Sequence, residues 1–168
     1  VLSIDGQMFI IFDEVTPSTP SSVETYWHLP PDVKKISIDN KNTDVALQNQ
    51  MLTQNSRISR YSIGIQDFEY LLSFSSSTLH STDLCFGLSG SQPQGWVTPR
   101  FRTIEPSHCL VMSDQNVSSM SNSTIVVNKE LGFEIISQTP FETFINCGEL
   151  GEVRIYMTEE GPKIDHIR

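Results

Sequence analysis

The sequence is poor in basic residues, poor in cysteine and without a long apolar run. Eleven Lys and Arg stand against 20 Asp and Glu, which gives a formal net charge of −9. An acidic chain is repelled by the phosphates of nucleic acids, so we expect no nucleic-acid partner. Its apolar runs are far shorter than the roughly 20 residues that span a bilayer. We therefore expect no membrane partner either.

The three cysteines are Cys85, Cys109 and Cys147. An odd count excludes a full disulfide framework and leaves a single disulfide open. Neither the cysteines nor the four histidines show the spacing of metal ligands, three or four of which must converge in space. Convergence of His28 and His108 across neighbouring strands is the one alternative. We therefore predict no metal site and no cofactor.

The sequence also lacks the motifs of a catalytic centre. The segment 87–91 reads Gly-Leu-Ser-Gly-Ser, which is not the strand-to-helix elbow of a serine hydrolase. The acidic pairs Asp13-Glu14 and Glu159-Glu160 are adjacent in sequence, so the two carboxylates of each pair point to opposite faces of a strand. Such a pair needs a partner from elsewhere in the chain. We predict no catalytic residue.

Alternation of apolar and polar residues dominates the chain, and no helical stripe stands out. Turn-forming clusters separate the alternating segments at spacings of about ten residues, which is typical of β-sandwiches and barrels. The 168 residues suffice for one domain with its own core. We therefore predict a single all-β domain over residues 1–168, an antiparallel β-sandwich of roughly 12–14 short strands.

Two segments depart from this alternation. Residues 73–82 are unusually rich in serine, which predicts an exposed strand edge or a loop. Residues 87–99 carry three glycines, two prolines and Trp96, and a loop of this length is uncommon in a compact domain. We expect Trp96 either to contact another domain or to fold back onto the core of this one.

Tyr26, Trp27 and His28 form an aromatic cluster on a predicted strand. Strand alternation places Tyr26 and His28 on one face and Trp27 on the other. One interpretation is a platform on which sugar rings stack. The alternative is a core Trp27 with His28 hydrogen-bonded to a loop. With Trp96 and Arg100, these three residues are the candidates for a carbohydrate-binding or interdomain site. Arg100 could join Arg57, Arg60 and Arg102 in a basic patch, or the four could be scattered along strand edges.

Four segments carry a resemblance to a known family. The first is a strand over residues 8–13, and the second is an aromatic strand that ends in His28-Leu29-Pro30. The third is Gly-Trp-Val-Thr-Pro-Arg-Phe at 95–101, and the fourth is a proline and apolar strand at 106–112. Over residues 1–112 the chain resembles the C-terminal β-rich part of heparinase II/III-like polysaccharide lyases. Phe101-Arg102 departs from the Tyr-Gly of that pattern.

The resemblance implies a larger protein, in which an N-terminal α/α toroid precedes the β-sandwich and acidic polysaccharides are cleaved by β-elimination. The catalytic and metal-binding histidines of such proteins lie upstream of where this chain begins. We thus expect a C-terminal supporting domain that is not catalytic alone, from a bacterial parent that is periplasmic or at the cell surface. The expected partners are the upstream helical domain and an acidic polysaccharide. The alternatives are a stand-alone carbohydrate-binding module and a structural β-domain.

Overall fold

The computed structural model describes residues 1–4, 8–38, 43–45, 50–88, 95–98, 102–148 and 151–167. Arg100, one of the candidate site residues, lies outside these ranges. The described residues form fifteen strands and one short 3-10 turn, η1 (Lys129–Leu131). The prediction of an antiparallel all-β, sandwich-like fold is confirmed. Within the same ranges, no helix has the length and apolar character needed to cross a membrane.

The larger sheet contains nine strands, and every pairing in it is antiparallel. Seven strands lie side by side in the order β1 (Leu2–Ile4), β2 (Met8–Val15), β11 (Met120–Asn128), β7 (Phe68–Phe86), β6 (Gln50–Ile65), β4 (Val33–Ile38) and β5 (Thr43–Val45). β10 (His108–Val117) pairs with β7, and β3 (Ser21–His28) pairs with β10.

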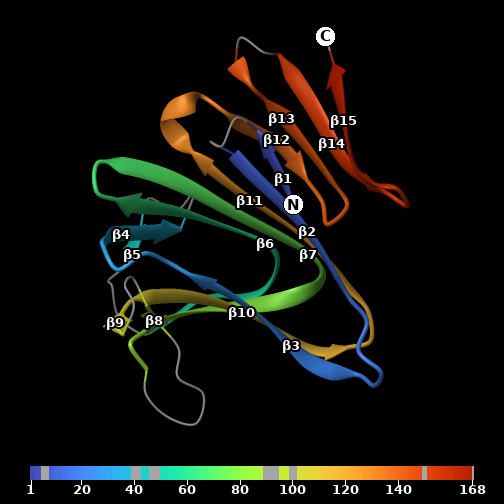
Figure 1. The fold of residues 1–168 in the computed structure, drawn as a ribbon. Coiled ribbons are helices and arrows are strands. Elements are labelled where there is room, and N and C mark those ends of the chain that lie inside the picture. The colour runs from blue at the N-terminus through green and yellow to red at the C-terminus, as the bar shows by residue number, and fades with distance from the viewer. Residues whose placement is uncertain are drawn as a thin grey trace.

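Strand β7 determines the shape of this sheet. Its first half pairs with β11, where Ser76 is opposite Asn122, and its second half pairs with β10, where His80 is opposite Asp114. The consecutive strands β10 and β11 thus lie on different halves of β7. As a result the sheet curls into a half-barrel, with β3 and β10 facing back toward β4 and β6 (Figure 1).

A smaller sheet covers the outside of this curl. Its order is β12 (Glu134–Gln138), β13 (Glu142–Asn146), β14 (Glu152–Thr158) and β15 (Gly161–Ile167). In Figure 1 it lies against β1, β2 and β11. A separate two-stranded pair, β8 (Trp96–Val97) with β9 (Glu105–Pro106), lies near the turn that leads into β10.

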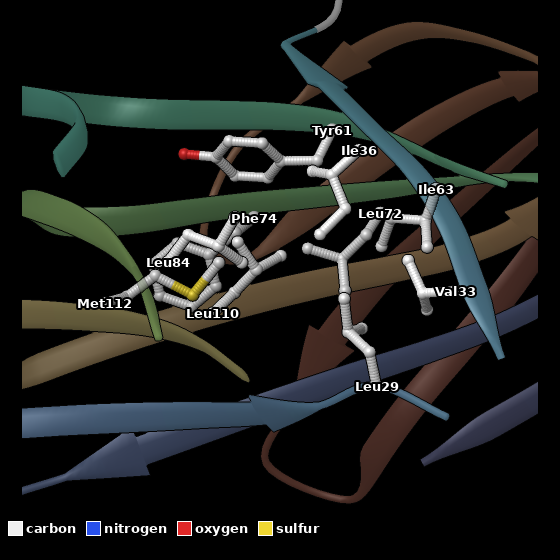
Figure 2. Close-up of a cluster of buried hydrophobic side chains, with 10 residues drawn as sticks. All are labelled: Leu29, Val33, Ile36, Tyr61, Ile63, Leu72, Phe74, Leu84, Leu110 and Met112. Atoms are coloured by element: carbon white, nitrogen blue, oxygen red, sulfur yellow. The ribbon is translucent and has the colours of Figure 1, made fainter. Parts of the chain in front are cut away.

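Two hydrophobic cores hold these layers together. The first lies inside the curl, and Figure 2 shows its ten buried side chains gathered between the strands: Leu29, Val33, Ile36, Tyr61, Ile63, Leu72, Phe74, Leu84, Leu110 and Met112. The second joins the two sheets and includes Met8 and Ile10 of β2, Ile125 of β11 and Ile155 of β14. Burying each large apolar side chain stabilises the fold by about 1.5–3 kcal/mol.

The expectation that residues 73–82 form an exposed edge or loop is wrong. These residues lie in the middle of β7, and Ser73, Ser75, Ser76, His80 and Thr82 are all buried. Small hydroxyl side chains are tolerated there because several of them are hydrogen-bonded. Ser73 Oγ donates to Gln138 of the smaller sheet, and Gln138 Nε2 donates in turn to the Ser123 carbonyl at 3.1 Å. Serine here bonds the two sheets together.

Candidate functional site

The structure separates the three members of the aromatic cluster on β3. Trp27 packs against the core inside the curl, whereas Tyr26 and His28 are exposed on the outer face. The rings of Tyr26 and His28 are nearly parallel, with centroids 6.4 Å apart and planes inclined by 19°. Trp27 therefore offers no ring to a ligand on that face. Of the three, Tyr26 and His28 keep the geometry that a stacking platform needs.

The Tyr26 hydroxyl is engaged by its neighbour on the same face. It donates a hydrogen bond to the Glu24 carboxylate. This bond, together with partial burial and the Glu24 charge, raises the pKa of Tyr26 to about 12. The phenol therefore stays protonated at any physiological pH. It can offer a ring face and a fixed hydroxyl, but not a proton-accepting phenolate.

His28 and His108 do not converge. His28 lies opposite Cys109 in the β3–β10 register, so His108, one residue earlier, points to the other face of the sheet. His108 is buried there, with its ring 4.6 Å from that of Phe86. Burial lowers the pKa of His108. In the part of the chain that the structure describes, no three His, Cys, Asp or Glu side chains gather as a metal site would require.

Gly95 holds the start of the Trp96 segment in place. Its carbonyl accepts hydrogen bonds from Gly87 N at 3.1 Å and from Ser107 N at 2.7 Å. Its φ is +71°, and an added Cβ would lie 2.6 Å from the Ser107 carbonyl oxygen. Any residue other than glycine is thus both strained and sterically blocked at this position. Trp96 is half-buried beside it and donates from Nε1 to the Leu88 carbonyl at 2.8 Å.

A serine–histidine pair that the sequence did not indicate lies inside the curl. Ser59 Oγ and His80 Nε2 are 2.9 Å apart, and Asp114 is directly opposite His80 in the β7–β10 register. The resemblance to a catalytic triad ends there. His80 Nδ1 and Asp114 Oδ2 each lack a hydrogen-bond partner, and Asp114 Oδ1 accepts instead from Thr78.

Burial decides what this polar cluster can do. Ser59 is 3% exposed, His80 1% and Asp114 1%, so a substrate cannot reach the hydroxyl. Burial lowers the pKa of His80 to about 4 and raises the pKa of Asp114. At neutral pH the imidazole is therefore uncharged. We interpret the cluster as a structural element of the bent strand rather than as a nucleophilic site.

The strongest candidate for a binding site lies at the turn between β6 and β7. Phe68 follows this turn and is 47% exposed. It forms a wall of two hollows, of about 460 and 490 Å³, which also share Glu130. The first hollow is lined mainly by polar and charged residues, and the second is lined mainly by the apolar and aromatic side chains Phe9, Tyr70, Val126 and Leu131. One exposed ring therefore separates a polar compartment from an apolar one.

Charged groups from three distant segments meet in the polar hollow. Lys35 comes from β4, Glu69 from β7 and Lys129 from η1. Lys129 Nζ lies 2.9 Å from Ser62 Oγ and 3.1 Å from Glu69 Oε1. The hydrogen bond from Lys129 to Glu69 is the main reason that the pKa of Glu69 is lowered. The hollow thus presents ammonium donors and carboxylate acceptors side by side.

Local sequence choices shape this end of the sheet. Gly64 lies opposite Glu69 and lines the polar hollow without a side chain of its own. Lys34 also reaches the turn, where its Nζ donates to the Gln66 carbonyl at 3.0 Å. Three of the five lysines of the chain are therefore found around one turn. The sequence offered no sign of this, because Lys34 and Lys129 lie 95 positions apart in the chain.

A third hollow, of about 440 Å³, lies between the two sheets. Its lining includes Phe12, Asp13 and Glu14 at the end of β2, and Phe141 and Glu159 from two turns of the smaller sheet. It therefore brings both Asp13 and Glu14 close to Glu159, one member of the other adjacent acidic pair. We assign no chemistry to these carboxylates. Comparison of the chain with protein-family models, with curated proteins and with solved structures finds no match.

Proposed function

We propose that this chain is a non-catalytic carbohydrate-binding domain and that sugar units bind around Phe68. The observation that carries the proposal is the exposed Phe68 ring between two hollows. An apolar ring face covers the C–H face of a pyranose, while hydroxyl groups need donors and acceptors nearby. Lys35, Lys129 and Glu69 supply both kinds of group in the polar hollow.

The charges of the polar hollow favour a neutral stretch of sugar units. Two ammonium groups, Lys35 and Lys129, line it together with three carboxylates, those of Asp67, Glu69 and Glu130. The net charge of the whole chain, −9, also repels polyanions. An acidic polysaccharide, the ligand that the sequence resemblance implies, is the second candidate. Its binding would depend on the lysines and would weaken steeply with added salt.

Isothermal titration calorimetry with a panel of soluble glycans tests the proposal. The panel pairs neutral chains (laminarin and soluble xylan) with acidic ones (alginate and heparin). We expect a neutral glycan to bind, and Phe68→Ala to weaken its binding at least tenfold, as truncation of a central aromatic contact does. Phe141→Ala is the matched control, because Phe141 is 55% exposed and lines a different hollow. The proposal fails if none of the glycans binds, or if both variants weaken binding equally.

A role as the C-terminal supporting domain of a heparinase II/III-like polysaccharide lyase is a second proposal, and its basis is the sequence resemblance. One structural observation is relevant to it. Gly95, the first residue of the third resembling segment, occupies a position that no other residue fits, so this segment serves the framework of the domain. In this proposal the helical domain of the parent carries out the β-elimination. Lyase assays on heparin, heparan, alginate and chondroitin should then show no unsaturated uronate from this chain alone, and turnover on any of them would refute the supporting role.

A further inference from the structure

Two of the three cysteines lie directly opposite each other on neighbouring strands. Cys85 of β7 is the register partner of Cys109 of β10. Opposite residues of an antiparallel pair point to the same face, and these two form a small buried cluster with Val111. Cys147 belongs to the separate core between the two sheets. The structure thus decides which two of the three thiols are neighbours.

Backbone hydrogen bonding fixes the separation of the two cysteines. Leu29 N donates to the His108 carbonyl at 2.8 Å, so the backbone groups of His108 face β3. Backbone groups alternate in direction along a strand, and those of Cys109 therefore face β7. Cys85 and Cys109 are then a hydrogen-bonded pair, whose Cα atoms are about 5.5 Å apart. Disulfides span Cα separations of about 4.4–6.8 Å, so this Cα separation permits one. The Cβ atoms of opposite residues are about 4.5–5.5 Å apart and have to approach to about 4 Å for the bond to form, which needs a small local adjustment of the two strands.

We propose that Cys85 and Cys109 are a thiol–disulfide modification site that reacts with low-molecular-weight disulfides such as glutathione disulfide. The Cys85 thiolate attacks one sulfur of glutathione disulfide and releases one glutathione thiolate. The Cys109 thiolate then attacks the Cys85 sulfur of the mixed disulfide and releases the second. The two protein thiols lose two electrons to glutathione disulfide, and their protons go to the two thiolates released.

Exposure sets the order and the rate of these steps. Cys85 is 8% exposed and Cys109 0%, so Cys85 is the more accessible of the two thiols and the one that reacts first with an external disulfide. Burial raises the pKa of both thiols, that of Cys109 to about 12. The reaction is therefore slow at neutral pH and faster in mild alkali, where the thiolate fraction grows. The disulfide would link β7 to β10 close to the point where the Gly95 carbonyl accepts hydrogen bonds from Gly87 N and Ser107 N.

The experiment uses the whole chain. The folded protein is incubated with glutathione disulfide at mildly alkaline pH, remaining thiols are alkylated, and the digest is mapped by mass spectrometry. We expect a peptide in which Cys85 is linked to Cys109, with Cys147 alkylated. Cys147→Ser should give the same product, and Cys85→Ser and Cys109→Ser should abolish it. The inference is overturned if Cys85 and Cys109 both remain alkylated, if either pairs with Cys147, or if only the glutathione adduct accumulates.

Thermal unfolding supplies a second measurement on the same samples. A crosslink compatible with the native register restricts the unfolded chain, so the melting temperature of the oxidised protein should rise by several degrees. Dithiothreitol should reverse the rise. A crosslinked protein that melts below the reduced one would show that the bond distorts the β7–β10 pairing, and this too would contradict the inference.

Discussion

The Lys129 ammonium group lies 3.1 Å from the Glu69 carboxylate, across the wall of the hollow beside Phe68. One residue comes from the turn after β11 and the other from the start of β7, so their meeting depends on the fold. Both side chains remain partly exposed, and such a surface pair stabilises a protein by only about 0.2–1 kcal/mol. Its effect is to hold the ammonium group in place beside the proposed sugar site.

This pair predicts a measurable titration. The hydrogen bond from Lys129 lowers the pKa of Glu69 in the folded state, so the bond contributes above the unfolded pKa and is lost as pH falls through the folded one. We expect the NMR titration midpoint of the Glu69 carboxyl to lie below 4.5, the ordinary value for glutamate. Lys129→Met should move it back toward 4.5. An unchanged midpoint in the variant would show that Lys129 does not cause the shift.

His80 should make stability depend on pH. Its pKa is about 4 in the folded state and 6.5 when exposed, so between these values the unfolded chain binds more protons. The free energy of unfolding should therefore fall as pH drops from 6.5 toward 4, by on the order of 3 kcal/mol for this group. Asp114 acts in the opposite direction, because its pKa is raised in the folded state.

The His80 contribution is isolated by comparing the wild type with His80→Gln in urea unfolding at pH 7 and pH 5. The wild type should lose more stability than the variant over this range, since both keep Asp114. Equal losses in the two proteins would mean that His80 is not buried in its neutral form, and the interpretation of the Ser59–His80 pair would have to be abandoned.

Asp114 is expected to lower stability at neutral pH. Its carboxylate is buried and raises the free energy of the folded state, although Oδ1 accepts a hydrogen bond from Thr78. Asp114→Asn keeps an acceptor for Thr78 and removes the charge, so it should raise the urea midpoint at pH 7. Asp114→Ala removes the acceptor as well and should destabilise by about 1–3 kcal/mol. If Asn is as destabilising as Ala, the charge itself is needed.

Gly95 and Gly132 form a matched pair for a test of the Trp96 segment. Their φ angles are +71° and +70°, but an added Cβ at Gly132 meets no atom within 4 Å. Gly132→Ala should therefore cost only the strain of a left-handed alanine, about 1–2 kcal/mol. Gly95→Ala adds the clash with Ser107 and should cost clearly more in chemical denaturation. Equal losses of stability in the two variants would show that a Cβ at position 95 does not meet the clash with the Ser107 carbonyl that the structure indicates.

The sequence predicted those features that depend on local alternation. The period of two predicted the strands, and it also placed Trp27 on the face opposite Tyr26 and His28. The prediction for residues 73–82 was wrong because it rested on their serine content instead. A serine-rich strand is exposed when it lies at the edge of a sheet, whereas β7 is a central strand. Short strands were also expected, but β6 and β7 have 16 and 19 residues.

The candidate site lay beyond sequence reasoning for a physical reason. The Phe68 hollows take Phe9 from β2, Lys35 from β4 and Lys129 from η1. These residues meet only through the strand order of the larger sheet, which no local pattern specifies. The same holds for Ser59 and His80, which depend on register shifts between Met51 and Ile58 in the long β6–β7 pairing.

The most direct test of the carbohydrate-binding account is an NMR titration of the isotopically labelled chain with the glycan that binds in calorimetry. The account predicts that the largest shifts fall on residues around the β6–β7 turn and η1, including Phe68, Glu69 and Lys129, and that Phe68→Ala removes them. Shifts centred instead on Tyr26 and His28, or none in the presence of any glycan tested, would contradict it.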